Sequence, residues 1–370
     1  MGWPMGYERA NMVDLNAYVP GLQPREVSVL KLNTNENPFP PPGAVLEAIR
    51  AVAGDELRRY PDPVASTFCQ KAAAIHGLGA DQVIATNGGD ELLRLAVTVF
   101  CQPRGVGTAA TWGGMAVGEP SYALYPVLAA IHDTPLVSVP LTERFELPAN
   151  FADRVVAAGC RLAVVANPHA PSGRLEPLDR LATIAGRLRG HAVLLIDEAY
   201  VDFAAADALA LLDRASGLDN VLLLRSLSKG YSLAGLRFGY GLGPADLIGV
   251  LQNARDSYNT DMVAQVAATA ALEHRDETAR SWRAVIDQRQ AVTGRLTRMG
   301  YRVFPSQSNF LLVVPPAGPG QPGARSIYQK LKDNGILVRY FDQTTLDDKL
   351  RLTVGTAAQN DVLLQALASL

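Results

Sequence analysis

The middle of the chain alternates short apolar runs with amphipathic segments. The runs "QVIAT" (82–86), "RLAVVAN" (161–167), "AVLLIDEAY" (192–200) and "NVLLLRS" (220–226) are almost continuously apolar in their interiors. Such runs, separated by helical patterns, are typical of a parallel sheet with helices on both faces. The pattern therefore predicts an α/β fold, with a mostly parallel central sheet in a large domain at residues 44–255.

The pattern changes on both sides of this region. The proline-rich "NENPFPPPG" (35–43) cannot form a helix interior, so residues 1–43 are predicted to form an extended arm. A long helical pattern covers about 261–299 and precedes two strand-like runs, "YRVFPSQSNFLLVV" and "GILVRYF". The helical "DVLLQALASL" closes the chain. Residues 256–370 are therefore expected to form a smaller α+β domain.

Composition narrows the class of protein. The 370 residues are 48% hydrophobic and 19% charged, which is typical of a globular protein with a sizeable core. A formal net charge of −2 gives no sign of a nucleic-acid or membrane partner. Glu8 and Arg9 interrupt the start, where a signal peptide needs an apolar core. Three widely spaced cysteines favour neither disulfides nor a metal site, so a cytoplasmic location is expected.

Polar residues follow the predicted strands, where parallel sheets bind their ligands. Lys229 stands among serines and glycines that leave room for another molecule. A lone loop lysine is usually a solvated charge, but a desolvated one can lose its proton and form a Schiff base. Arg237 suits a surface ion pair or a phosphate clamp. The turn "NGGDELL" (87–93) opens a helix and could bind an anion.

Asp197 ends an apolar strand, where a carboxylate is costly to bury without a partner. An ion pair or a helix cap would explain it, and so would contact with a protonated heteroaromatic nitrogen. Tyr200 lies three residues further on and could present its hydroxyl to the same ligand. A phosphate site, a nucleophilic lysine, an aspartate and a tyrosine together match the needs of pyridoxal phosphate.

Several motifs carry a family resemblance. The segment "SLSKGYSLAGLRFGY" resembles the lysine signature of fold-type I, class II pyridoxal-phosphate aminotransferases. The segments "EPSYALY", "NPHAPSG", "DEAYVDF" and "LRLTVGT" are similar to further motifs of that family, in the expected order. With "LNTNENPFPPP" and "YPDP", the chain most resembles the histidinol-phosphate aminotransferase subfamily, from about residue 18 to its end.

The resemblance implies roles for individual residues around the cofactor. Lys229 would form the internal aldimine and later move the proton between the substrate Cα and the cofactor C4′. Asp197 would pair with the pyridine nitrogen, Asn167 and Tyr200 would bond the 3′-oxygen, and Tyr122 would stack on the ring. The residues expected around the phosphate are Gly89, Asp90, Ser226, Ser228 and Arg237. Tyr60 would reach the partner's cofactor phosphate, which requires a homodimer with shared active sites.

The resemblance also implies a substrate pocket and a reaction. Arg351 would take the substrate's anionic group with help from Arg339, and Tyr18, Asn35 and Glu36 would line the pocket. The expected reaction is ping-pong transfer from L-histidinol phosphate to 2-oxoglutarate, which gives imidazole-acetol phosphate and L-glutamate in histidine biosynthesis. The same residues also suit an aromatic or broad-specificity aminotransferase. A phosphothreonine decarboxylase or a non-catalytic pyridoxal-phosphate-binding protein are weaker alternatives.

Three segments depart from the family pattern. The loop "NPHAPSG" has His169 and Ala170 where polar asparagines are usual, and His169 is expected to be a loop residue rather than a catalyst. The turn "GGD" lacks a hydroxyl that could bind phosphate. The stretch 104–118, which contains Trp112, looks longer than usual and could reshape the pocket rim.

Overall fold

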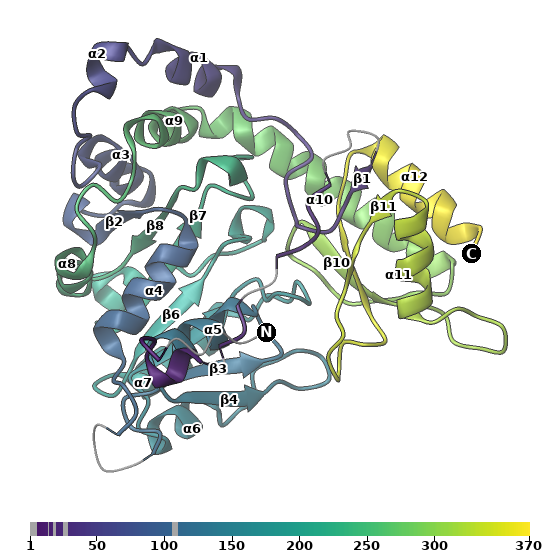
Figure 1. The fold of residues 1–370 in the computed structure, drawn as a ribbon, viewed down its shortest axis with the longest axis horizontal. Helices are drawn as coiled ribbons and strands as arrows, with labels where there is room; N and C mark the ends of the chain where they lie inside the picture. Colours follow the sequence, from purple (N-terminus) through teal and green to yellow (C-terminus); the bar gives the residue numbers. More distant parts are fainter. Residues whose placement is uncertain (1–5, 14, 18–19, 25–28, 106–109) are drawn as a thin grey trace.

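The computed structural model describes the chain except for residues 1–5, 14, 18–19, 25–28 and 106–109. Figure 1 shows a larger unit around a central sheet and a smaller unit that carries the C-terminus. The sheet has the strand order β2 (Val83–Thr86), β8 (Gly239–Leu242), β7 (Val221–Ser226), β6 (Val193–Asp197), β5 (Leu162–Ala166), β3 (Met115–Glu119) and β4 (Leu136–Pro140). All neighbours are parallel except β8, which is antiparallel to both β2 and β7.

Both faces of this sheet are buried, because alternate side chains of each strand enter different cores. In β5, Ala163 and Val165 join one core, while Leu162 and Val164 join the other. The first core includes residues of α3 (Ser66–His76), α6 (Phe151–Ala157) and α7 (Leu178–Leu188). The second includes residues of α4 (Gly89–Phe100), α5 (Leu124–Ile131) and α8 (Ala245–Ala254). The predicted helix-covered, mostly parallel sheet is thus confirmed.

The smaller unit contains an antiparallel sheet in the order β12 (Arg339–Tyr340), β13 (Leu350–Thr353), β10 (Phe310–Val314) and β9 (Arg302–Val303). Its core includes side chains from α10 (Arg275–Arg298), α11 (Ala324–Asp333) and α12 (Ala357–Ala368). The arm strand β1 (Leu30–Lys31) pairs in parallel with β11 (Ile336–Leu337). From β1 the chain crosses to α1 (Gly43–Ala51) and α2 (Gly54–Leu57) on the larger unit (Figure 1).

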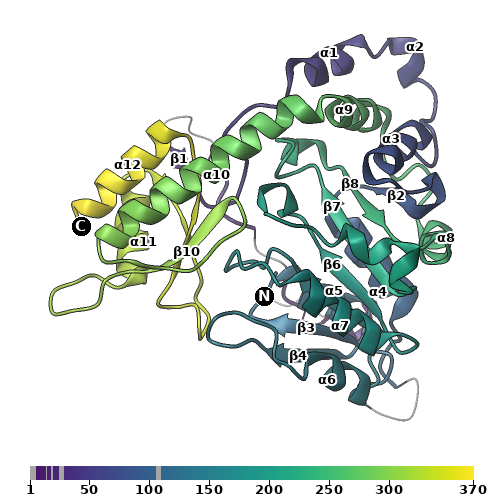
Figure 2. The same cartoon turned by 180° about the vertical axis from the view of Figure 1, so that it is seen from behind.

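The helical stretch predicted at 261–299 consists of two helices that meet at His274, α9 (Met262–Glu273) and α10. Helix α9 packs against α1 and α3 of the larger unit, and α10 extends from there to the smaller one (Figure 2). The run "GILVRYF" also divides, because β11 pairs with the arm and β12 pairs with β13. The domain boundaries at residues 43 and 255 stay predictions.

Candidate active site

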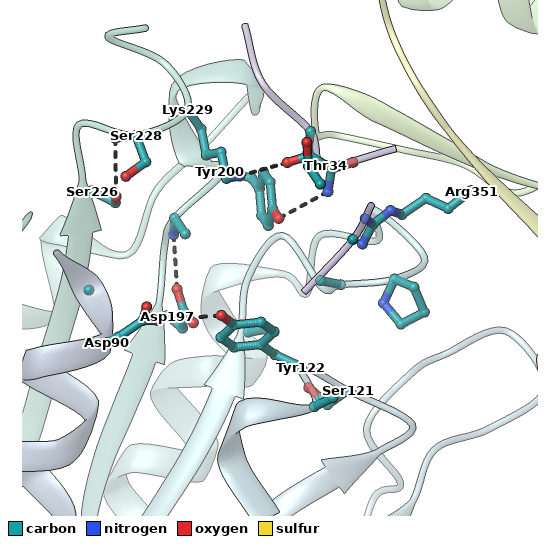
Figure 3. A pocket seen from close by; sticks show the side chains of 18 of the residues that line it. Thr34, Asp90, Ser121, Tyr122, Asp197, Tyr200, Ser226, Ser228, Lys229 and Arg351 are labelled. Carbon is teal, nitrogen blue, oxygen red and sulfur yellow. Dashed lines mark hydrogen bonds between the residues drawn. The ribbon is translucent and has the colours of Figure 1, made fainter. Parts of the chain in front are cut away.

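A cavity of about 260 Å³ lies where the carboxyl ends of the central strands meet α4, the arm and the smaller unit. Figure 3 shows side chains from these separate elements pointing into one space. The site residues expected from the sequence that line it are Asn35, Gly89, Asp90, Tyr122, Asp197, Tyr200, Ser226, Ser228, Lys229, Arg237, Arg339 and Arg351. The topology brings them together because parallel strands end at the same edge of a sheet.

Lys229 lies in the turn that follows β7. Its Nζ donates a hydrogen bond of 3.0 Å to the backbone oxygen of Thr34 and lies 5.8 Å from the centre of the Tyr200 ring (Figure 3). Burial, together with the nearby charge of Arg351, lowers the pKa of Lys229 to about 8. A substantial fraction of this amine is therefore neutral near physiological pH, which a nucleophilic lysine requires.

Asp197 is the last residue of β6 and is buried. Its carboxylate accepts hydrogen bonds from the Tyr125 hydroxyl at 2.7 Å and from the Ala199 amide at 3.0 Å. Burial raises the pKa of Asp197 to about 6, although both hydrogen bonds oppose the change. A cationic ring nitrogen placed beside this carboxylate would offset the cost of its burial.

Tyr200 follows Asp197 by three residues and faces the arm. Its hydroxyl oxygen accepts a hydrogen bond of 3.0 Å from Nδ2 of Asn35. Burial raises the pKa of Tyr200, so the phenol keeps its proton and can act as a hydrogen-bond donor. The cavity wall therefore offers a hydroxyl donor next to the arm.

The start of α4 and the turn after β7 together offer donors that suit an anion. Gly88 has φ 75°, and a Cβ added there would lie 2.7 Å from the Arg237 guanidinium. Arg237 contacts Asp90 at 3.3 Å and the Ser228 hydroxyl at 3.5 Å. Glycine thus permits the close approach of the guanidinium, and free backbone N–H groups at a helix start favour an anion. Hydroxyls, a guanidinium and a helix start are the donors that a phosphate group needs.

The wall on the side of the smaller unit combines two arginines with aromatic rings. The Arg351 guanidinium lies 5.2 Å from the ring centre of Phe310 and 5.6 Å from that of Phe341. Arg351 also donates to the backbone oxygen of Asn33 at 3.0 Å. The Arg339 guanidinium lies 5.5 Å from the same Phe341 ring. This arrangement can hold an anionic group beside a flat apolar surface.

Four residues expected from the sequence are not among the described residues that line the cavity, and their roles stay predictions. The Asn167 amide bonds the backbone of Glu176, accepting from its N–H at 2.7 Å. Tyr60 is 79% exposed and stacks on another aromatic ring. Glu36 forms an ion pair of 2.5 Å with Lys31. Tyr18 lies outside the described residues.

Two of the segments that depart from the family motifs make defined contacts in the structure. The buried His169 donates from Nε2 to the backbone oxygen of Pro120 at 2.8 Å and accepts from the Ser172 hydroxyl at 2.8 Å. Burial lowers its pKa to about 4, so this ring is neutral and joins two loops. Trp112 contacts Gly159 and the guanidinium of Arg161. None of the described residues of 104–118 lines the cavity, and an effect of this segment on the pocket rim stays a prediction.

The structure adds residues that the sequence reasoning missed. Tyr125, in the first turn of α5, follows Tyr122 by three residues in "EPSYALY" and also lines the cavity. Tyr122 precedes the helix, so helical spacing alone did not indicate this second tyrosine. Thr34 bonds Lys229 through its backbone, and the Phe341 ring lies beside both arginines. Among the described residues, no group of acidic, histidine or cysteine side chains could hold a metal ion. Within the same described ranges, no helix is both long and apolar enough to span a membrane.

Comparison with known proteins places this geometry in a family. A sequence model of the family "Aminotransferase class I and II" matches residues 27–367. A histidinol-phosphate aminotransferase 1 of Trichormus variabilis is 40% identical over 366 residues, 98% of this chain and 99% of the relative. One of Methylococcus capsulatus is 39% identical over 368 residues, covering 98% of this chain and 97% of the relative. The crystal structure of histidinol-phosphate aminotransferase from Sinorhizobium meliloti in complex with pyridoxal-5'-phosphate has a TM-score of 0.82 at 28% identity, covering 91% of this chain and 89% of that one.

Proposed function

The chain belongs to the aminotransferase class I and II family, and we propose that it is a pyridoxal-phosphate-dependent histidinol-phosphate transaminase. It transfers the amino group of L-histidinol phosphate to 2-oxoglutarate and forms imidazole-acetol phosphate and L-glutamate. The observation that carries the reaction type is a single cavity with Lys229, Asp197 and Arg237 on its wall. Near-full-length similarity to proteins named for this activity supports the choice of donor.

The residues of the cavity fit pyridoxal phosphate. When bound, this cofactor supplies an aldehyde that condenses with amines and a ring that withdraws electrons. Asp197 would hold the ring nitrogen, and Tyr200 would bond the ring's 3′-oxygen. The serines beside Arg237 and the start of α4 would hold the phosphate. Gly88 and Gly89 support this assignment, because a Cβ at either position would lie within 3.0 Å of a neighbouring side chain.

Lys229 performs the covalent and proton-transfer work of the chain. Its lowered pKa supplies a neutral amine that can attack the cofactor aldehyde at moderate pH. Once the substrate amine has replaced it, the freed Lys229 amine would take the proton from the substrate Cα and return it to the acceptor carbon. Such a base acts best with a pKa near the working pH, which burial provides here.

Arg351 and Arg339 would bind the anionic groups of both substrates. A guanidinium recognises a phosphate and a carboxylate in the same bidentate way. The donor's phosphate and a carboxylate of 2-oxoglutarate would therefore use the same side of the cavity in turn. The Phe341 ring beside both arginines also suits a phenyl side chain, so an aromatic amino-acid aminotransferase is the second candidate.

A homodimer with shared sites completes the proposal. Tyr60 is 79% exposed, and its ring stacks on Tyr258 at a centroid distance of 4.5 Å. Leu57 and Val64 expose further apolar surface on the same chain segment. This surface supports a contact through which Tyr60 reaches the partner's cofactor phosphate. Three free, buried cysteines support a location in the reducing cytoplasm.

Steady-state assays test the proposed reaction. The loaded protein is given 2-oxoglutarate with L-histidinol phosphate, and L-glutamate formation is measured against parallel reactions with phenylalanine and tyrosine. We expect the largest kcat/KM for L-histidinol phosphate and parallel double-reciprocal plots, as ping-pong transfer requires. A larger kcat/KM for an aromatic amino acid would contradict the proposed donor and favour the second candidate.

A further inference from the structure

Three consecutive residues of the arm each contact a different functional group of the site. The backbone oxygen of Asn33 accepts from Arg351, and that of Thr34 accepts from Lys229, both at 3.0 Å. The third contact uses a side chain, because Nδ2 of Asn35 donates to the Tyr200 hydroxyl at 3.0 Å. A substitution of Asn35 can therefore remove this contact. A substitution of Asn33 or Thr34 would leave the backbone oxygen, and so its contact, in place.

The orientation of the Asn35 side chain is fixed by the smaller unit. The residue is 1% exposed and has φ 56°, a left-handed conformation that asparagine tolerates better than most residues. Its backbone N–H donates to the Thr353 hydroxyl oxygen at 3.1 Å, and its backbone oxygen accepts from Asn309 at 2.9 Å. The Thr353 hydroxyl in turn donates to Oδ1 of Asn35 at 3.1 Å. With Oδ1 occupied, the amide presents its NH₂ group to Tyr200.

This contact determines where the phenol proton can point. A tyrosine hydroxyl has one proton to donate and can also accept a hydrogen bond. Because Asn35 donates to the Tyr200 oxygen, the phenol proton must lie on another side of that oxygen. We propose that Asn35 is a positioning residue that directs the Tyr200 hydroxyl proton toward the 3′-oxygen of the cofactor ring. The inference rests on the proposed function, because it requires pyridoxal phosphate in this cavity.

The role has a measurable electrostatic consequence. A hydrogen bond donated to the ring oxygen stabilises its anionic form. The stabilised oxygen holds the neighbouring proton on the Lys229 nitrogen less strongly, so that proton leaves at lower pH. Without Asn35, the phenol proton can turn toward other acceptors. The loaded site should then keep the Lys229 proton to higher pH.

The test is a pH titration of the visible absorption of the loaded protein, which reports the proton on the Lys229 nitrogen. Asn35→Gly removes the amide and keeps a backbone that tolerates positive φ. We expect the titration midpoint of this variant to rise by about 0.5 to 1 pH unit, which is the usual effect of one hydrogen bond. Thr353→Val should raise the midpoint less, because the amide remains but loses the hydroxyl that orients it.

A double-mutant comparison separates positioning from a structural effect. Asn35→Gly in a Tyr200→Phe background should leave the midpoint of that background unchanged, since no hydroxyl remains to direct. Asn37→Gly is the matched control, because Asn37 lies on the same arm but its amide donates to Gly230 and Ser281 instead of Tyr200. Its midpoint should equal that of the unmodified protein. If Asn35→Gly does not fold, Thr353→Val in the two backgrounds carries the same comparison.

Two results would overturn the inference. One is an unchanged midpoint in Asn35→Gly protein that binds cofactor normally. The other is an equal shift with and without the Tyr200 hydroxyl, which would mean that Asn35 acts by another route. If the unmodified protein acquires no visible absorption with pyridoxal phosphate, the proposed function fails first and the inference with it.

Discussion

The Tyr125 hydroxyl donates a hydrogen bond of 2.7 Å to the carboxylate of Asp197. Both side chains are buried, and they join α5 to the end of β6. The contact favours the ionised form of a carboxylate whose pKa burial has raised to about 6. Tyr125 therefore helps Asp197 to keep its negative charge. A protonated ring nitrogen would need that charge as its partner.

Tyr125→Phe should change how cofactor affinity depends on pH. Because a raised pKa means that Asp197 gains its proton as the pH falls through about 6, affinity for pyridoxal phosphate should fall there. Without the tyrosine donor the pKa rises further, so the fall should begin at higher pH, by about one unit. Equilibrium dialysis across this pH range measures the change.

Tyr240→Phe is the matched control for that measurement. Tyr240 is buried, and its hydroxyl bonds Nε2 of His76 at 3.0 Å, a contact between residues that do not line the cavity. Ionisation of the cofactor phosphate affects both variants equally. Only the difference between their affinity curves therefore reports the protonation of Asp197. Equal curves for the two variants would contradict the role given to Tyr125.

Uptake of the cofactor by the empty protein should accelerate with pH. The pKa of Lys229 is lowered by burial to about 8, so the fraction of neutral amine increases as the pH rises through that value. Stopped-flow absorption at several pH values should give a rate that rises and then levels above about 8. In Arg351→Ala the midpoint should move up, because a cation that lowers the lysine pKa is gone. A midpoint near 10 in the unmodified protein would contradict the desolvated site.

Lys229→Ala should reduce transamination by at least about a thousand-fold, since one residue supplies both the nucleophile and the proton carrier. Initial rates of L-glutamate formation measure the loss. Lys71→Ala removes a partly exposed lysine that pairs with Glu273 at 3.4 Å, and it should keep normal rates. Substantial activity in the Lys229 variant would remove the central assignment.

Arg351→Ala should raise the KM of the donor and lower its kcat/KM by about a hundred-fold, the cost of a lost charge-assisted hydrogen bond. Arg339→Ala should have a smaller effect of the same sign. Arg325→Ala serves as a control, because that exposed side chain pairs with Asp342 at 2.5 Å on the smaller unit. Unchanged kinetics in Arg351→Ala would mean that the substrate anion binds elsewhere.

The sequence predicted the elements that depend on local pattern. Apolar runs identified the central strands, and the residues after them included Asp197 and Lys229. Glycines and serines around Arg237 indicated the anion site for the same local reason. These residues meet in one cavity because strand ends converge whatever the longer connections do, and their roles toward a ligand stay predictions.

Contacts that depend on distant packing were not predictable. Lys229 bonds a backbone oxygen 195 positions away, and a backbone acceptor leaves no mark in the sequence. The Asn167 amide bonds Glu176 because a nearby backbone N–H competes for its oxygen. The split of "GILVRYF" between two sheets depends on the arm, which supplies the partner strand of β11.

The most direct test of the account is a single half-reaction without any oxo acid. The protein loaded with pyridoxal phosphate is mixed with L-histidinol phosphate, and separately with phenylalanine, tyrosine and glutamate. The visible absorption is followed as pyridoxamine phosphate forms. The account predicts rapid conversion by L-histidinol phosphate and glutamate, and slow conversion by the aromatic amino acids. Conversion by the aromatic amino acids with none by L-histidinol phosphate would contradict it.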